Sequence, residues 1–419
     1  MLEFTSLTEK EYQKFFSNHK QASFMQTIEL GHLKKELGDI VHYVGVKKNN
    51  EIIAATLILE QKTFLNFKTF YAPRGFLIDY HDKELLTFFT NNLKKYVKKR
   101  KGFRIIIDPN VIYRVRNNDG SIRENDEPND IAVNNLKSLG FKHFGFNNYL
   151  EAIQVRWECR LKLDKPYEEL KKDFSKSTRK NIDACYKKGL QVRMGKMEDL
   201  DSMTELFDNT AKRKDFQTRN LAYYKKMYKH MGNLMNIYIA YIDPIQYIES
   251  AKNNLEEEIK NNEEILHKME TSLVGNKLKN QKETSDNLII KYKNELEIAK
   301  DFKEKYPNGK DIAALLSMKS GEEYLTLSSG SLEDYRKFTP KYAMYDYHIK
   351  DAYRMGYKWI DFYGISGCFD KDDKFYGVYE FKKGFGADVV ELIGQFELKV
   401  TNVHVVFNLL KRIKNIIRK

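Results

Sequence analysis

The sequence lacks the features that mark several large classes of protein. Its three cysteines, Cys159, Cys185 and Cys368, are widely spaced and odd in number. They match neither a disulfide framework nor a zinc or redox motif, so we expect reduced structural thiols. The longest apolar runs, such as residues 52–59, are far too short to span a bilayer. The N-terminus has no basic region followed by an apolar core, and we therefore expect a cytosolic protein.

The chain also lacks the short motifs of common cofactor and nucleophile sites. It contains no P-loop, no dinucleotide fingerprint and no G-x-S-x-G elbow. The 9 histidines form no recognisable pattern with a cysteine or a serine. Metal catalysis and covalent nucleophilic catalysis are therefore poor hypotheses. The remaining polar residues are mainly lysines, arginines, tyrosines and one strand-end aspartate, which suit the binding of anions and the positioning of two substrates.

Basic residues are abundant and unevenly distributed. The formal net charge is +13, and the bases concentrate at residues 94–104 (KKYVKKRKGFR), at residues 171–188 and in the tail, residues 403–419. Each run alone is also typical of a solvated helix face. Together the runs favour a phosphate-rich partner, either nucleic acid or an anionic membrane surface. The length and the 42% hydrophobic content allow two or more packed domains.

The middle of the chain, from about residue 245 to 306, carries a charged heptad pattern. A first seam has the 4-3-4-3-4 spacing of a coiled coil and consists of Leu255, Ile259, Asn262, Leu266, Met269 and Leu273. A second seam, after a turn at residues 274–276, consists of Ile289, Tyr292, Leu296 and Ala299. The pattern predicts two antiparallel helices of about 25 to 28 residues that project by about 40 Å.

Two uses of such an arm stay open. It resembles the tRNA-gripping arm of seryl-tRNA synthetase, and a dimerisation or spacer arm is the alternative. Lys277, Lys279 and Lys282 near the tip favour an anionic partner slightly. Polar Asn262 in the seam would fix the register of the helices in either case.

A helix followed by a similar strand occurs twice. A predicted helix at residues 83–101 precedes GFRIIID (102–108), and one at residues 342–355 precedes GYKWIDF (356–362). We infer a duplicated α/β unit with the arm inserted into the second copy. The predicted domains are a first unit at 1–150, a second unit at 151–245 and 308–398, the arm at 246–307, and a basic C-terminal helix at 399–419.

Several passages carry a family resemblance, among them FYAPRGFLIDY, IIIDPN, STRKNIDACYKKGLQVR, DFQTRNLAYY, DFYGISGCF and GVYEFKKGFGADVVELIGQF. In this order they resemble the FemABX family, the peptidoglycan bridge aminoacyltransferases, along essentially the whole chain. The likeness is greatest to the FemA and FemB branch, which carries the arm. The resemblance implies an α/β (α+β) fold of two tandem GNAT-like units with an inserted antiparallel coiled-coil arm.

The same resemblance implies the substrates and partners. The donor would be aminoacyl-tRNA and the acceptor a lipid-linked muropeptide precursor of the lipid II type, at the inner face of the membrane. No cofactor is implied, and the Q/R-x-x-G-x-G/A turn that holds coenzyme A in ordinary GNAT enzymes does not occur in the chain. A homodimer or a complex with related bridge transferases stays open.

Three residues correspond to the reacting part of the family site. Lys382 in EFKKGF matches a lysine proposed to stabilise the oxyanion or the tRNA end, with a surface lysine as the alternative. Phe381 matches the accompanying aromatic residue, although a core phenylalanine is equally compatible. Asp108 matches an aspartate near the attacking amine, and it could instead be a turn residue before Pro109. We expect Asp108 and Lys382 to face one cleft.

Four further residues correspond to the binding part of the site. Lys34, Arg219 and Tyr223 match positions that hold the phosphate or sugar portion of the acceptor, and Arg74 is a weaker binding candidate. The step from Arg219 to Tyr223 puts both on one face if the segment is helical. Surface ion pairs or packing are the alternatives for each residue.

The predicted reaction is aminoacyl transfer from tRNA to an amine of the stem or bridge peptide. Because the ester is already activated, positioning could supply much of the rate. One alternative is a non-enzymatic tRNA-binding or immunity-like protein of the same fold. The other is an acetyl-CoA-dependent GNAT enzyme with an oligomerisation arm.

Overall fold

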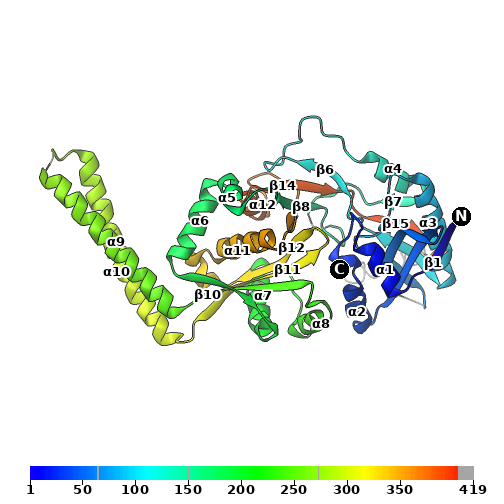
Figure 1. Ribbon diagram of the computed structural model, residues 1–419, viewed down its shortest axis with the longest axis horizontal. Coiled ribbons are helices and arrows are strands. Elements are labelled where there is room, and N and C mark those ends of the chain that lie inside the picture. The colour runs from blue at the N-terminus through cyan, green and yellow to red at the C-terminus, as the bar shows by residue number, and fades with distance from the viewer. Residues whose placement is uncertain (64–65, 150, 272, 404–419) are drawn as a thin grey trace, which may run out of the picture.

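The computed structural model describes residues 1–63, 66–149, 151–271 and 273–403. Within these residues the chain forms two mixed sheets that follow one another along the long axis, and a pair of long helices projects from one end (Figure 1). The first sheet has the strand order β1-β2-β3-β4-β5-β15-β7. The second has the order β6-β14-β8-β13-β12-β11-β10-β9.

The first sheet and its helices come mainly from the N-terminal part of the chain. Its strands are β1 (Leu2–Ser6), β2 (Ile40–Lys48), β3 (Glu51–Lys62), β4 (Lys68–Ala72), β5 (Gly102–Ile107), β7 (Phe141–His143) and β15 (Phe396–Lys399). The accompanying helices are α1 (Glu9–Phe16), η1 (Phe24–Gln26), α2 (Ile28–Glu36), α3 (Lys83–Lys99) and α4 (Asp130–Ser138). Strands β4 and β5 are parallel, and the other neighbours in this sheet are antiparallel.

The second sheet has its own helices on both faces. Its strands are β6 (Ile112–Arg116), β8 (Trp157–Lys162), β9 (Leu190–Gly195), β10 (Met235–Ile242), β11 (Lys310–Ser320), β12 (Glu323–Ser331), β13 (Trp359–Ile365) and β14 (Asp388–Leu392). The helices are α5 (Tyr167–Asp173), α6 (Lys176–Lys187), η2 (Met197–Asp199), α7 (Leu200–Lys214), α8 (Leu221–Met231), η3 (Glu333–Phe338), α11 (Pro340–Arg354) and α12 (Tyr376–Lys383). Only β12 and β13 pair in parallel among these described strands.

Alternation along the central strands of the second sheet builds two cores. Tyr238 and Ala240 of β10 point into the core beneath α11, whereas Ile237 and Ile239 point into the core beneath α7. Successive side chains of a strand face opposite sides, so a strand covered on both faces reads as a continuous apolar run. The α7 core also contains Leu33 of α2, and it therefore joins the two units.

The order of elements confirms two GNAT-like units. Strands β1 to β5 and strands β9 to β13 each form an antiparallel series that ends in one parallel pair. Asn49 and Asn50, both with positive φ, join β2 to β3 in a tight turn of the kind favoured in hairpins. The arm joins the corresponding strands β10 and β11, which is where the duplication predicted an insertion.

The two units exchange strands near their boundary. Strand β6 comes from the N-terminal part of the chain and pairs with β14 in the second sheet, while β15 from the C-terminal part pairs with β5 in the first. The predicted boundaries at residues 150 and 398 therefore do not separate the sheets. The predicted C-terminal helix at 399–419 begins at the last residue of β15, and its residues 404–419 lie outside the described part.

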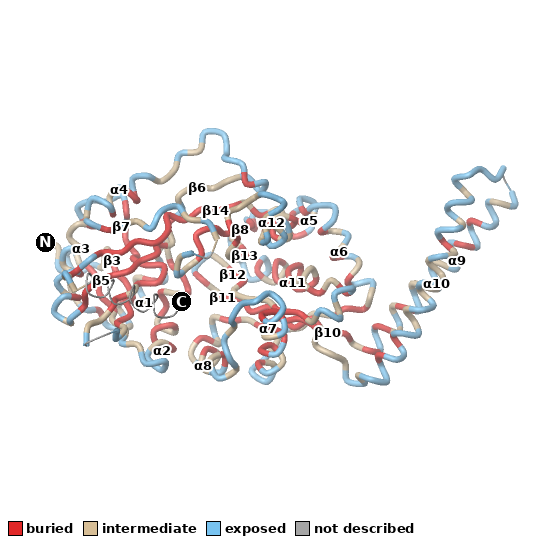
Figure 2. The backbone as a smooth tube through the Cα atoms, turned by 180° about the vertical axis from the view of Figure 1, so that it is seen from behind, coloured by how far each residue is buried: buried red, intermediate tan, exposed pale blue. Residues whose placement is uncertain are grey.

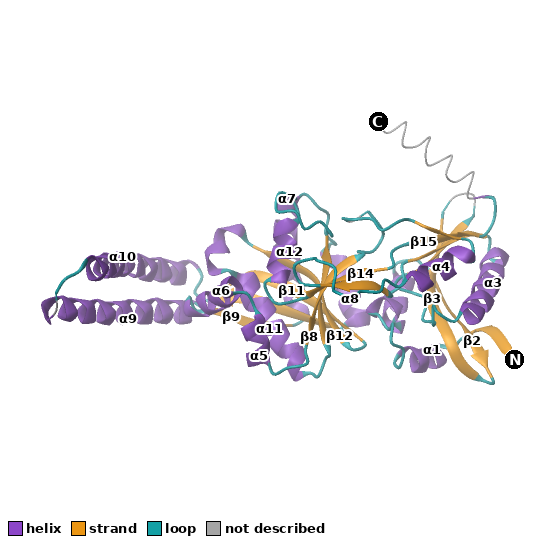
Figure 3. Cartoon of the chain, turned by 90° about the horizontal axis from the view of Figure 1, so that it is seen from above, coloured by secondary structure: helices purple, strands orange, loops and turns teal. Residues whose placement is uncertain are grey.

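The arm consists of α9 (Pro244–Thr271) and α10 (Asn276–Lys305), two helices of 28 and 30 residues that lie side by side (Figure 3). Outside the contact between the helices it is largely exposed (Figure 2). From Ala251 on, the α9 positions with 4-3 spacing that are buried or half-buried are Ala251, Leu255, Glu258, Asn262, Ile265 and Met269. Asn262 donates hydrogen bonds of 3.0 Å to Ser285 and to Asp286 of α10.

Half of the predicted α9 seam is wrong. Leu255, Asn262 and Met269 lie in the contact, but Ile259 and Leu266 are 37% and 42% exposed, and Leu273 is fully exposed beyond the end of α9. Two overlapping series of 4-3 spacing fit the α9 sequence, one through Leu266 and the other through Ile265. Packing against α10 selects the series with Ile265, one residue before Leu266.

Candidate active site

Asp108 lies at the end of β5, where the parallel pair β4 and β5 places both carboxyl ends at one edge. Its carboxylate is buried and accepts two hydrogen bonds of 2.7 Å, from the Tyr71 hydroxyl and from the backbone N–H of Arg74. Burial raises the pKa of Asp108 to about 6, against the opposing effects of Arg74 and Tyr71. Asp108 is therefore mostly ionised at neutral pH and becomes protonated below about pH 6.

Lys382 lies on α12 and points at β13. Its buried Nζ donates hydrogen bonds of 3.0 Å and 2.6 Å to the carbonyl oxygens of Tyr363 and Gly364. An ammonium has three N–H donors, and the described residues supply no third acceptor. Burial lowers the pKa of Lys382 to about 8, so the side chain is mostly cationic at neutral pH. One donor thus remains for a ligand.

Hydrogen bonds, together with the covalent frame of Tyr363, connect Asp108 of the first unit with Lys382 of the second. The Tyr71 hydroxyl that contacts Asp108 accepts from Gln154 Nε2 at 3.3 Å, and Gln154 Oε1 accepts from the Tyr363 hydroxyl at 3.0 Å. The carbonyl of Tyr363 then accepts from Lys382. Tyr71, Gln154 and Tyr363 are partly exposed while the two ends are buried. These three side chains are therefore the accessible part of the arrangement.

Tyr363 has an unusual backbone conformation at this point. Its φ is 62°, in the left-handed region that a bulky residue with a Cβ rarely adopts. Its N–H donates to Asp361 Oδ1 at 2.6 Å. Strained residues of this kind occur often at functional sites, although the strain alone assigns no role.

Arg74 is occupied by internal partners. Its buried guanidinium donates to Glu158 at 2.7 Å and to the carbonyl of Val155 at 3.0 Å. Glu158 also pairs with Arg160 at 2.7 Å, and Arg160 pairs with Glu323 at 2.5 Å. The structure therefore argues against Arg74 as a substrate contact, because binding would leave buried Glu158 without this partner. Arg74 instead positions Asp108 through its N–H.

Lys34, Arg219 and Tyr223 come together between α2 and α8. Arg219 lies just before Asn220, the N-cap of α8, and therefore outside the helix that carries Tyr223. Its guanidinium nevertheless lies 5.1 Å from the centre of the Tyr223 ring. Burial lowers the pKa of Lys34, and Arg219 acts in the same direction while Asp39 opposes it. Within the described residues neither cation forms an ion pair, so the two together suit an anion.

The two groups share one apolar support. Tyr363 and Tyr223 both pack against the α7 core, which also contains Leu33, the neighbour of Lys34. The cationic group around Lys34 and the hydrogen-bonded chain therefore lie on the same core, where the first unit meets the second.

Phe381 is partly buried in an aromatic cluster. Its ring centre lies 4.8 Å from that of Tyr345, 5.1 Å from that of Tyr342 and 5.3 Å from that of Phe385. These contacts fix α12, and thereby Lys382, against α11. A substrate contact by Phe381 stays a prediction.

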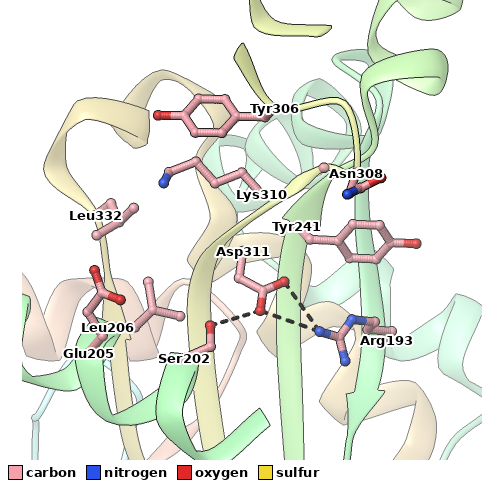
Figure 4. A pocket seen from close by; sticks show the side chains of 11 residues that line it. Arg193, Ser202, Glu205, Leu206, Tyr241, Tyr306, Asn308, Lys310, Asp311 and Leu332 are labelled. Atoms are coloured by element: carbon pink, nitrogen blue, oxygen red, sulfur yellow. Dashed lines mark hydrogen bonds and ion pairs between the residues drawn. The ribbon is translucent and has the colours of Figure 1, made fainter. Parts of the chain in front are cut away.

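Two cavities lie away from these side chains. One, of about 550 Å³, lies at the base of the arm, where Arg193 pairs with Asp311 and with Asp199 (Figure 4). The other, of about 840 Å³, lies between the units and reaches Arg160 and Asn110. Neither is lined by any of the seven candidate residues. Neither cavity is therefore the cleft that was expected between Asp108 and Lys382, and that cleft stays a prediction.

Sequence reasoning missed the residues in the middle of the chain. Tyr71 and Tyr363 lie in the passages FYAPRGFLIDY and DFYGISGCF, which carry the resemblance, but nothing in the letters distinguishes them from core tyrosines. Gln154 lies in a segment without any motif, and only the fold brings it between the two tyrosines.

Two tandem GNAT-like units with a polar chain between them define a tandem N-acyltransferase class of protein. The model of the FemAB family matches residues 7–412. The aminoacyltransferase FemA of Staphylococcus epidermidis strain RP62A is 32% identical over 417 residues, which cover 99% of this chain and 100% of that protein. FemA of Staphylococcus aureus strain MW2 is 31% identical over 420 residues, with 99% of each chain covered.

A solved structure agrees with these relatives. The crystal structure of FemX has a TM-score of 0.78 and 27% identity, and the match covers 97% of this chain and 99% of that one. The chain belongs to the FemAB family. No described helix combines the length and the apolar character needed to cross a bilayer.

Proposed function

We propose that this protein transfers an amino acid from aminoacyl-tRNA to an amine of the stem or bridge peptide of a lipid-linked peptidoglycan precursor. The observation that carries the proposal is the chain from Asp108 to Lys382, which joins a carboxylate and an ammonium across two units. The relatives named aminoacyltransferases support the reaction class.

The reaction forms one bond to the carbonyl carbon of the ester and breaks another. The neutral amine nitrogen attacks that carbon, and negative charge develops on the carbonyl oxygen. The bond to the ribose oxygen then breaks, and the proton lost by the amine compensates the charge of that oxygen. The free donor of Lys382 faces the developing oxyanion in this proposal, and such a donor contributes about 10²–10³-fold to the rate.

Asp108 acts through Tyr71 in this proposal. Both of its oxygens are already hydrogen-bonded, and the carboxylate is buried, so the Tyr71 hydroxyl is the group that an incoming amine meets. Deprotonating a lysine-type amine with a pKa near 10.4 costs about 4 to 5 kcal/mol at pH 7, whereas an α-amine costs about 1 kcal/mol. A positioned acceptor therefore matters most for a lysine acceptor.

Lys34, Arg219 and Tyr223 are assigned to the acceptor. Two cations without ion pairs suit its diphosphate, and a phenol suits a sugar hydroxyl. The lipid-linked acceptor places the protein at the inner face of the membrane as a peripheral cytoplasmic protein. Aminoacyl-tRNA serves as the donor without a cofactor, and a homodimer or a complex with related transferases stays open.

The test is incubation of the purified protein with labelled aminoacyl-tRNAs and lipid-linked precursor, followed by mass analysis of the muropeptide. We expect one added aminoacyl residue and loss of label from the tRNA. Retention of tRNA without a new amide would favour the non-enzymatic alternative. Binding and consumption of acetyl-CoA would favour the acetyltransferase alternative.

A further inference from the structure

Helix α11 begins without a side-chain cap. Thr339, in the left-handed region, is its N-cap and makes no side-chain capping bond, and Pro340 follows as its first residue. The first turn of this 15-residue helix contains no acid, and Lys341 is its second residue. Helix N-termini carry partial positive charge, so a lysine there is repelled and an anion is attracted.

The Lys341 side chain is mostly buried and has no partner. Across the described residues it forms neither a hydrogen bond nor an ion pair. Burial lowers its pKa, and Arg213 and Lys214 act in the same direction, with Glu333 opposing them. Glu333 is already paired with Arg213. A desolvated cation of this kind is stabilised when an anion binds.

Lys341 also lies beside the reaction centre. The next residue, Tyr342, packs its ring 5.1 Å from that of Phe381, the neighbour of Lys382. The charge of Lys341 contributes to the lowered pKa of Lys382, so the two ammonium groups are close enough to repel each other. An anion bound at Lys341 would therefore lie close to Lys382, the residue that faces the developing oxyanion in the proposed reaction.

The end of α7 extends the positive charge toward the acceptor site. Its last turn carries Arg213, which pairs with Glu333, and Lys214, and both cations act on the pKa of Lys341. Arg219 follows Lys214 by five residues, a distance of at most about 18 Å along the chain. The electrostatic interactions of Lys341 with Lys382 and of Arg219 with Lys34 define two groups of cations.

We propose that Lys341 and the uncapped first turn of α11 bind a phosphodiester at the 3′ end of the donor tRNA, next to the ester that Lys382 serves. The inference rests on the proposed function and adds a donor-binding residue to it. A phosphate of the acceptor offers the same chemistry, but Lys34 and Arg219 already provide a site for it. The donor is favoured because its last phosphodiester lies within one nucleotide of the reacting ester.

The test compares Lys341→Met with Lys212→Met, which removes an equal charge from an exposed lysine at the end of α7. We expect Lys341→Met to raise the KM for aminoacyl-tRNA and the Kd for uncharged tRNA by about tenfold. The salt dependence of log Kd should become shallower by about one unit. The KM for the acceptor should stay unchanged, and Lys341→Arg should restore donor binding.

The thermal unfolding temperature provides a second test. Because the unliganded lysine is desolvated at a helix N-terminus, Lys341→Met should unfold at the same temperature as the wild type or higher. If Lys341→Met does not fold, Lys341→Gln takes its place in the same assays. Unchanged donor binding, or an effect no larger than that of Lys212→Met, would overturn the inference, and so would a raised KM for the acceptor alone.

The two proposals fail in different ways. A wild-type protein that makes no amide with any aminoacyl-tRNA defeats the proposed function. A wild-type protein that is active together with a Lys341→Met variant that binds tRNA normally defeats only the role of Lys341.

Discussion

The two GNAT-like units share a strand order but differ in what they add to it. In the first unit two asparagines close the hairpin between β2 and β3, whereas in the second the 28- and 30-residue helices of the arm occupy the corresponding connection. The first unit contributes a buried carboxylate, Asp108, and the second a buried ammonium, Lys382. A duplicated scaffold can therefore divide one site between its copies, because neither unit holds both charges.

Burial acts on the two charges in opposite directions. It raises the pKa of Asp108 to about 6 and lowers that of Lys382 to about 8. Both shifts move the groups toward neutral pH, where a proton acceptor and a cationic donor can coexist. Replacing either side chain should show whether Asp108 and Lys382 have these separate roles.

Removing the cation of the second unit should have the largest effect. Lys382→Ala deletes the donor for the oxyanion, and we expect transfer to fall by about 10²–10³-fold in kcat. The matched control is Lys383→Ala, a change at the next residue of α12, which should keep near wild-type activity. Circular dichroism and thermal unfolding check the fold. Full activity of folded Lys382→Ala would remove its role.

Removing the two cations at α2 and α8 should affect binding instead. Lys34→Ala combined with Arg219→Ala should raise the KM for the lipid-linked acceptor by about 30-fold or more, since each of the two charge-assisted contacts contributes about 1 kcal/mol or more. The kcat should change little. Lys35→Ala is the control, because that neighbouring lysine pairs with Glu9 on the surface. A drop in kcat without a change in KM would contradict the assignment.

The carboxylate of the first unit should be visible in the pH dependence. The ratio of the wild-type rate to the Asp108→Asn rate removes the titration of the substrate amine, which both proteins share. The pKa of Asp108 is raised to about 6, so the ratio should be constant above pH 7 and fall about tenfold per unit below pH 6. The exposed Asp372→Asn should give a ratio near one throughout. A flat ratio for Asp108→Asn would show that its charge is not used.

The smallest effect on chemistry should come from the arm. Asn262→Ala removes hydrogen bonds to Ser285 and Asp286 within the contact of α9 and α10, and we expect a loss of about 1 to 3 kcal/mol in local stability. Hydrogen exchange of the arm measures it, with Asn261→Ala on the exposed face as the control. Transfer with saturating substrates should be unchanged. Equal protection in both variants would mean that Asn262 does not stabilise the contact.

Local patterns predicted much of the fold. The helix α3, the strands β5 and β13, and the insertion of two long helices follow from apolar periodicity and its interruptions. The exchange of β6 and β15 could not be predicted, because pairing between distant strands leaves no local signal. The seam of α9 was ambiguous since both Ile265 and Leu266 satisfy heptad spacing.

In the hydrogen-bonded chain between the two units, only the end residues Asp108 and Lys382 were predicted from the sequence. Asp108 and Lys382 follow from the resemblance, and the structure connects them through side chains that no motif marks. Arg74 was a weaker binding candidate, and its buried partner Glu158, 84 residues away in the sequence, could not be predicted from any local pattern. Pairing of this kind is decided by the fold.

The central claim is that the two units act as one site through Tyr71, Gln154 and Tyr363, and a double-mutant cycle tests it most directly. Transfer rates are measured for Tyr71→Phe, Tyr363→Phe and the double variant, with the exposed Tyr353→Phe replacing Tyr363→Phe in a control cycle. We expect a coupling energy of about 0.5 to 3 kcal/mol for Tyr71 with Tyr363 and additivity in the control. Additive effects of Tyr71→Phe and Tyr363→Phe, within about 0.3 kcal/mol, would contradict it.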